Sequence, residues 1–275
     1  MILLLVFTVL NSCTKKVPVK IQWAASLENA LKMASEKDKP IIADFWSEGW
    51  QWCKRLEDST FTRQNVINLS ADMIFVKTEA KKDTQVRDRY KIAGYPTIIL
   101  MKSSGEEIDR IYGYVPADTF VSIIGDYLKG INTLEDLQRK FKENPKDVNL
   151  SFRLAEKYEG RKAYDQANSY YQKVVELDPD NEKGKAEDAL YSLASLDIRQ
   201  KDYPKALDAF KYFLQKFPKS QMALDAEEYI PYCYTKSGDT TRAIELYQVF
   251  LTQHPDSPDT DWVRDRIKDL RGEKK

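Results

Sequence analysis

Residues 41–46 read Ile-Ile-Ala-Asp-Phe-Trp, an apolar run that a single aspartate interrupts. Such a run is typical of a strand that is buried on both faces of a sheet. Before it, apolar residues at helical intervals predict a helix over 27–34, which the charged stretch 36–39 and Pro40 end. After it, the pattern predicts strands at 73–76, 97–101 and 108–112, a hairpin turn at 103–106 and a helix at 117–128. Strands alternating with helices predict an α/β domain with helices on both faces of the sheet.

Two motifs in this domain resemble motifs of the thioredoxins. Residues 44–48 (Asp-Phe-Trp-Ser-Glu), followed by Cys53, are similar to the junction between strand and helix in that family. Residues 94–97 (Gly-Tyr-Pro-Thr) are similar to its cis-proline loop. The resemblance covers residues 21–129 and implies a thioredoxin fold. In that family a Cys-x-x-Cys pair begins the helix; the first cysteine attacks a disulfide as thiolate and the second resolves the mixed disulfide.

The first cysteine of this pair is missing. If Cys53 is the second, the first position is Trp50, and residues 46–52 contain no cysteine. The resemblance implies that Asp44 is the buried aspartate that assists the resolving cysteine, and that Pro96 is the cis-proline. Each also has an ordinary explanation, as a hydrogen-bonded buried carboxylate and as a residue that shapes a turn. The missing nucleophile argues against catalysis by a dithiol.

Cys53 itself has three interpretations. It is a small core residue, a single reactive thiol near Lys54 and Arg55, or a disulfide partner of Cys233. The second interpretation makes the protein a monothiol oxidoreductase or a redox sensor.

Aromatic residues crowd the same loop, which is the substrate-facing edge of the thioredoxin fold. Trp46, Trp50 and Trp52 either form a peptide-binding patch or pack internally. Trp50 and Trp52, with Tyr95 of the proline loop, are the candidate partner-binding residues of this domain.

Residues 146–275 carry an internal repeat. Pro179, Pro218 and Pro255 follow one another at intervals of 39 and 37 residues. Twelve residues before each proline is an alanine, and four residues after that alanine is an aromatic residue. A small residue where helices cross, with an aromatic one turn later, favours close packing of helix pairs. The pattern resembles about three tetratricopeptide repeats, so the chain is expected to be an α/β thioredoxin-like domain followed by an all-α domain of helical hairpins, with 130–145 as a connecting helix or linker.

Such repeats bind partner segments along the face formed by their first helices. The resemblance places Tyr191, Ser195, Arg199, Tyr232 and Lys236 on this face, although each is equally compatible with a solvated helix surface.

Other residues of the repeats have structural expectations. Pro231 predicts a kink in the first helix of the third repeat, Cys233 is expected in the core and His254 is expected to be exposed. Residues 262–270 are typical of a terminal capping helix.

The first twelve residues are expected to be an export signal. Residues 1–10 are almost purely apolar, too few to span a bilayer but typical of a signal peptide. Residues 10–13 (Leu-Asn-Ser-Cys) resemble a bacterial lipobox, which implies that Cys13 is lipidated and that 13–20 is a linker. No Lys or Arg precedes the apolar run, so another export signal or a cytosolic protein are the alternatives.

Composition excludes several functions. The 43 basic and 43 acidic residues balance, which argues against nucleic-acid partners. One histidine and three separated cysteines offer no metal-ligand spacing, and no cofactor motif is present. We therefore expect a membrane-anchored, periplasm-facing protein of the bacterial envelope that binds other proteins or peptides, with a monothiol oxidoreductase or sensor using Cys53 as the alternative.

Overall fold

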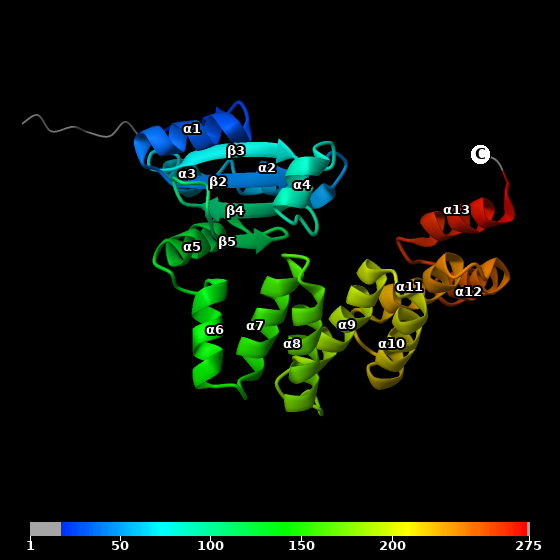
Figure 1. Ribbon diagram of the computed structural model, residues 1–275. Coiled ribbons are helices and arrows are strands. Elements are labelled where there is room, and N and C mark those ends of the chain that lie inside the picture. Colours follow the sequence, from blue (N-terminus) through cyan, green and yellow to red (C-terminus); the bar gives the residue numbers. More distant parts are fainter. Residues whose placement is uncertain (1–17, 274–275) are drawn as a thin grey trace, which may run out of the picture. The chain divides into compact units, whose positions relative to one another are not determined.

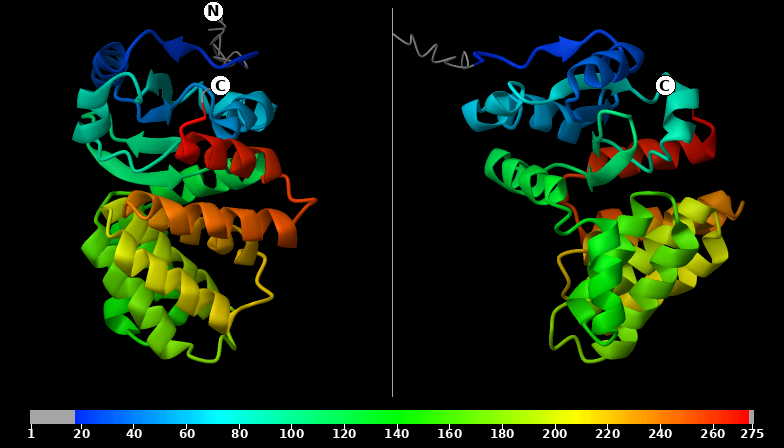
Figure 2. Two further views of the ribbon diagram at one scale, coloured as in Figure 1. Left: turned by 90° about the vertical axis from the view of Figure 1, so that its right-hand side faces the viewer. Right: turned by 60° about the vertical axis from the view of Figure 1, so that its left-hand side comes forward.

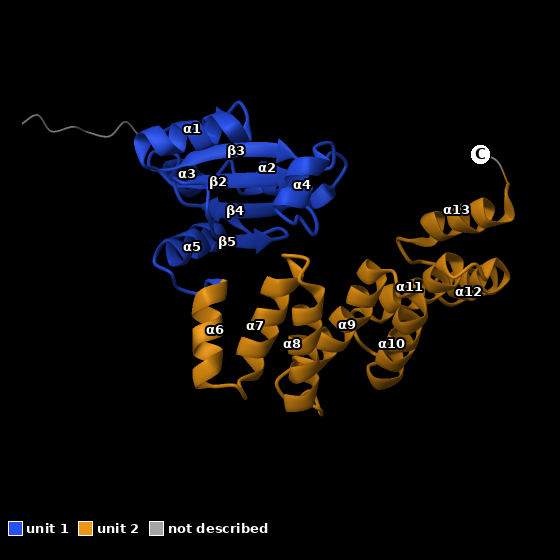
Figure 3. Ribbon diagram, viewed as in Figure 1, with its two compact units in different colours: residues 1–133 blue, residues 134–275 orange. Residues whose placement is uncertain are grey.

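The computed structural model describes residues 18–273, which divide into two compact units at Thr133 (Figure 3). The expected signal peptide and Cys13 lie outside the described residues. Within 18–273, no helix has both the length and the apolar composition that a bilayer crossing requires.

The first unit is built on a sheet with the strand order β1-β3-β2-β4-β5 (Figure 1). Strands β1, β3 and β2 are parallel, whereas β4 and β5 are antiparallel to their neighbours. The elements are β1 (Trp23–Ala24), α1 (Leu27–Lys37), β2 (Ile41–Trp46), α2 (Gln51–Ser59), α3 (Gln64–Leu69), β3 (Ile74–Glu79), α4 (Thr84–Arg89), β4 (Thr97–Met101), β5 (Glu107–Tyr112) and α5 (Ala117–Leu128).

Most sequence predictions for this unit are confirmed. The bounds of β2, β4 and α5 are those predicted, and β3 and β5 start within one residue of the expected positions. Helix α1 runs three residues further than expected. The Ser26 hydroxyl caps its first turn, and Asp38 in the left-handed conformation ends it.

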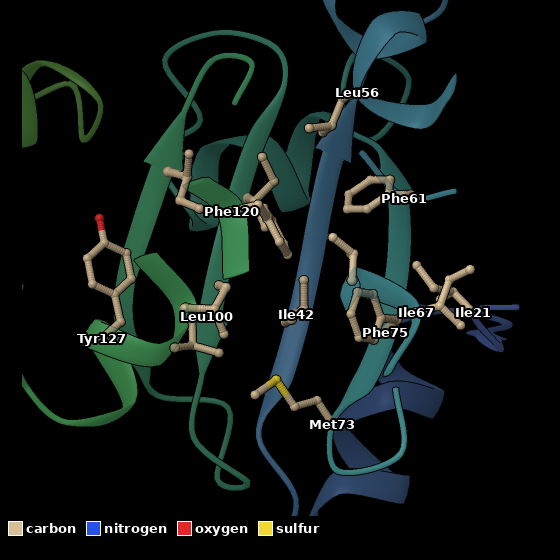
Figure 4. Close-up of a cluster of buried hydrophobic side chains, with 14 residues drawn as sticks. Ile21, Ile42, Leu56, Phe61, Ile67, Met73, Phe75, Leu100, Phe120 and Tyr127 are labelled. Carbon is tan, nitrogen blue, oxygen red and sulfur yellow. The ribbon is translucent and has the colours of Figure 1, made fainter. Parts of the chain in front are cut away.

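The sheet has a hydrophobic core on each face. In one core, Ile42 of β2 and Phe75 of β3 meet Phe61 and the α5 residue Phe120 (Figure 4). In the other, alternate residues of the same strands pack beneath α1. Because successive side chains of a strand point to opposite faces, Asp44 lies on the same face as Ile42, the face that α2 covers.

The second unit consists of helices joined by short loops (Figures 1 and 2). Its helices are α6 (Leu134–Glu143), α7 (Val148–Glu159), α8 (Tyr164–Leu177), α9 (Ala186–Gln200), α10 (Tyr203–Lys216), α11 (Ala223–Lys236), α12 (Thr240–Gln253) and α13 (Thr260–Arg271). Helices α7 to α12 form three successive pairs. The repeat residues lie at their crossings, all buried: Ala167, Tyr171, Ala206, Phe210, Ala243 and Tyr247.

The structure bears on four expectations for the repeats. Helix α11 runs through Pro231 as one element, and Cys233 is fully buried in it as expected. Helix α13 contains the expected capping segment. The expectation that His254 is exposed is wrong: its ring is half-buried, and its Nε2 lies 2.6 Å from Oε2 of Glu227.

Candidate functional site

The site is formed where β2 ends and α2 begins. Gly49 turns the chain with a φ of 81°, a left-handed conformation that glycine adopts without strain. Trp50 follows as the N-cap residue of α2 and makes no side-chain capping bond. Its side chain is 51% exposed. An exposed indole therefore occupies the helix N-terminus, the place where the helix dipole would stabilise a thiolate.

Cys53 lies in the first turn of α2 and is almost completely buried, with 8% of its surface exposed. Burial raises the pKa of its thiol; a backbone hydrogen bond from Ser47 opposes this rise, and the nearby Asp44 adds to it. Cys53 and Cys233 are both free thiols, so the structure contains no disulfide between them. At neutral pH Cys53 is therefore a protonated, poorly accessible thiol.

We expect Cys53 to react slowly with iodoacetamide. A smaller thiolate fraction and a buried sulfur both lower the rate, by at least about tenfold relative to the same cysteine in the unfolded chain. Mass spectrometry of the Cys53 peptide, after timed labelling at pH 7.5 with and without urea, measures this ratio. Equal rates in the two conditions would show that Cys53 is a reactive thiol.

Asp44 of β2 is 4% exposed. Its Oδ1 is buried and has no hydrogen-bond partner among the described residues. Burial raises the pKa of Asp44 to about 7; the charge of Lys77 opposes the rise and that of Glu57 increases it. Lys77 cannot fully compensate Asp44, because its Nζ lies 2.6 Å from Oε1 of Glu57.

Asp44 and Cys53 line a pocket of about 230 Å³ between the β2–α2 loop, α2 and β3. Trp46 and Trp50 also line it. The remaining lining residues are Ser47, Glu48, Gly49, Lys54, Glu57, Asp58 and Lys77.

The proline loop adjoins this site. The Tyr95–Pro96 peptide bond is cis, as the resemblance implies. Burial raises the pKa of the Tyr95 phenol, with a lowering effect from Arg87 and a raising effect from Cys53. Phe45 of β2 pairs with Thr97 of β4, so the sheet brings the two sequence motifs together.

An aromatic rim extends the site along α2. Trp52 is 42% exposed and stacks on Tyr114, with ring centroids 5.8 Å apart. The guanidinium of Arg55 lies 5.4 Å from the Trp52 ring and 4.8 Å from the Tyr114 ring. Sequence reasoning missed Tyr114, because it lies 62 residues further along the chain than Trp52. These contacts hold Trp52 and Tyr114 in place, and together with the exposed Trp50 at the start of α2 we call these three residues the aromatic rim.

The candidate residues of the repeats come from α9 and α11. Tyr191 packs on Phe210 and Phe213. The Lys236 ammonium lies 5.3 Å from the ring centroid of Tyr232.

Two further candidates lie on α9. An Arg199 guanidinium nitrogen lies 3.5 Å from Oε1 of Glu159. Ser195 is half-buried.

Sequence reasoning missed Glu228 on α11. Its Oε1 is buried without a hydrogen-bond partner among the described residues. Burial raises the pKa of Glu228 to about 7.

In the part of the chain that the structure describes, no group of His, Cys, Asp and Glu side chains has an arrangement that could hold a metal ion.

Comparisons with known proteins agree with this architecture. Residues 27–128 match the family described as a thioredoxin-like domain, and 150–181 match the tetratricopeptide repeat. Residues 183–264 match a family described as an outer membrane lipoprotein.

Similar proteins include members of the thioredoxin group. The thiol:disulfide interchange protein DsbD of Actinobacillus pleuropneumoniae is 26% identical over 109 residues, which are 38% of this chain but only 18% of DsbD. The chloroplastic thioredoxin Y of Oryza sativa is 29% identical over 120 residues, 43% of this chain and 67% of that protein.

Solved structures resemble parts of this chain. The DsbH oxidoreductase matches 41% of this chain and 88% of its own, with 21% identity and a TM-score of 0.35. The MamA structure matches 58% of this chain and 87% of its own, with 19% identity and a TM-score of 0.44.

Proposed function

We propose that this chain, a thioredoxin-like domain followed by tetratricopeptide repeats, is a protein-binding scaffold of the bacterial cell envelope that performs no dithiol catalysis. The proposal includes export and anchoring through a lipid on Cys13. The match of residues 183–264 to an outer membrane lipoprotein family and the similarity to DsbD support the envelope location.

The indole of Trp50 carries the proposal. Reduction of a disulfide by a thioredoxin-like site needs a thiolate at the N-terminus of the helix and a second thiol to resolve the mixed disulfide. Trp50 occupies the first of these places with a large, exposed, non-nucleophilic side chain. Such a side chain contributes contact area at low entropic cost, which suits binding rather than group transfer.

The rim offers a surface of the right chemistry. Its aromatic rings are half-exposed, and Arg55 provides a charged group beside them. Aromatic residues and arginine are the types that contribute most to binding energy at protein interfaces. The face of α9 and α11 that carries Tyr191 and Tyr232 supplies a second surface in this proposal.

A photo-crosslinking experiment tests the scaffold function. The full-length chain with p-benzoylphenylalanine in place of Trp52 is irradiated in intact cells, and adducts are resolved with and without reducing agent. We expect a discrete adduct that reducing agent does not remove. The matched control carries the same amino acid in place of Tyr212, an exposed residue of α10 outside both proposed surfaces. Adducts that depend on Cys53 and disappear on reduction would contradict the proposal.

A monothiol function is the second candidate, because Cys53 lines the pocket beside Asp44. In this alternative the thiolate of Cys53 attacks a partner disulfide, and a thiol of the partner resolves the product. The buried position and raised pKa of Cys53 oppose it. The iodoacetamide experiment distinguishes the two functions, since only the second requires fast labelling of Cys53.

A further inference from the structure

The pocket at the β2–α2 junction contains one carboxyl group without a counter-ion. The exposed pairs around it are matched: Lys54 lies 2.8 Å from Asp58, and Glu48 lies 3.3 Å from Lys82. At the back of the pocket, Lys77 is paired with Glu57. Asp44 is the exception, because it is more than nine-tenths buried and its Oδ1 has no partner among the described residues.

The charge of the pocket selects the sign of a ligand. Four carboxyl groups line it, and three of them are paired with an ammonium group, so the remaining carboxylate, Asp44, favours a cation and repels an anion. The exposed indole of Trp50 and the half-buried indole of Trp46 add ring faces, which attract ammonium and guanidinium groups. The volume of about 230 Å³ is several times the roughly 30 Å³ share of one water molecule, so a side chain can enter.

We propose that this pocket binds the cationic side chain of a lysine or arginine from a partner protein, with Asp44 as the counter-ion and Trp50 covering the stem of the side chain. The site then recognises a basic residue beside the helix N-terminus at which a thioredoxin carries its attacking cysteine. Asp44 gains the ion pair that the protein itself does not provide, which stabilises the complex because an unpaired buried carboxylate is costly.

This inference rests on the proposed function only for the source of the cation. Free probes test the pocket itself: N-acetyl-lysine N-methylamide, its arginine analogue and its norleucine analogue, which has an apolar side chain of similar length. Binding to the full-length chain is followed through the indole N–H resonances of Trp46 and Trp50. We expect both cationic probes to bind at least about tenfold more tightly than the norleucine probe.

Two variants make the test specific. Asp44→Asn should reduce binding of the lysine probe to the level of the norleucine probe. Glu106→Gln removes a charge from the turn between β4 and β5, outside the pocket, and should leave binding unchanged. Equal binding of lysine and norleucine probes, or full binding by Asp44→Asn, would overturn the inference. The photo-crosslinking result at position 52 does not depend on either outcome, so the two proposals can fail separately.

The pH dependence gives an independent readout. The cation requires the ionised carboxylate, so affinity for the lysine probe should rise between pH 6 and pH 8 and then level off. Asp44→Asn should abolish this dependence. The other ionisable groups that face Asp44 come from the β2–α2 loop, α2 and β3, and they are Glu48, Cys53, Lys54, Glu57, Asp58 and Lys77. A pH dependence that persists in Asp44→Asn would assign the effect to one of these and contradict the role of Asp44.

Discussion

Replacing Trp50 with cysteine should create a disulfide reductase. In the presence of dithiothreitol, the wild-type chain is expected to reduce insulin at the background rate, and Trp50→Cys at least about tenfold faster. The substitution places a thiol at the N-cap position of α2, where the helix dipole lowers its pKa, three residues before Cys53. The two thiols then pass two electrons to an insulin disulfide and become a disulfide, which dithiothreitol reduces again. Turbidity from the precipitating insulin B chain measures the rate.

Two controls define what the gain of activity means. Trp50→Ser removes the same indole without adding a thiol and should remain inactive. Trp50→Cys combined with Cys53→Ser keeps the attacking thiol but lacks the resolving one, so it should trap mixed disulfides without turnover. Activity in the wild type that Cys53→Ser abolishes would refute the scaffold proposal in favour of the monothiol function.

The strands and long helices could be predicted because their signals are local. The run at 41–46 and the amphipathic pattern at 117–128 specify β2 and α5 without any tertiary information. Strand β1 could not be predicted in this way. It contains only Trp23 and Ala24, and it exists because these residues pair with Phe75 and Val76 of β3. Helices α3 and α4 have six residues each, too few for a pattern to be read or for an isolated helix to be stable.

The site was only partly predictable for a related reason. Two short motifs identified Asp44, Cys53, Trp50 and Pro96 as neighbours. They did not show that Asp44 lacks a hydrogen-bond partner, because this depends on Lys77 being paired with a residue 20 positions earlier in the chain. They also did not show the contact between Trp52 and Tyr114, which arises only when β5 delivers the segment after it to α2. Such properties belong to packing and charge pairing between distant segments, which a local pattern does not contain.

The same distinction applies to the repeats. The spacing of the alanine and aromatic residues identified the helix pairs, because close crossing requires these residues at fixed intervals. It did not show that Arg199 pairs with Glu159 of another repeat, or that Oε1 of Glu228 is buried without a hydrogen-bond partner among the described residues. Binding chemistry on this face therefore depends on contacts between neighbouring repeats rather than on the repeat pattern itself.

Asp44→Asn should stabilise the thioredoxin-like domain, and the gain should depend on pH. Burial raises the pKa of Asp44 from its ordinary 3.8 to about 7, so the folded state holds a proton that the unfolded state has released between these values. Below pH 3.8 both states hold the proton, and the contribution of the neutral carboxyl group to the free energy of unfolding is fully present. This contribution is lost as the pH rises from 3.8 through about 7. Three units of pKa correspond to a ceiling of about 4 kcal/mol, and the buried amide of asparagine recovers most of it, about 3 kcal/mol at pH 8.

Urea unfolding at pH 4 and pH 8 measures this difference, with Asp58→Asn as the matched control. Asp58 is an exposed carboxylate of α2 that pairs with Lys54, and its loss should change the free energy of unfolding by less than about 0.5 kcal/mol. For Asp44→Asn, an equal gain at both pH values would mean that shape or packing, and not charge, is responsible. A gain confined to high pH would show that the native protein holds an unpaired carboxylate at a cost in stability. Burying an unpaired carboxylate is unfavourable, and a cation that binds to it offsets part of this cost. Because the lysine probe would bind the folded state only, it should then restore part of the free energy of unfolding that the charge of Asp44 removes.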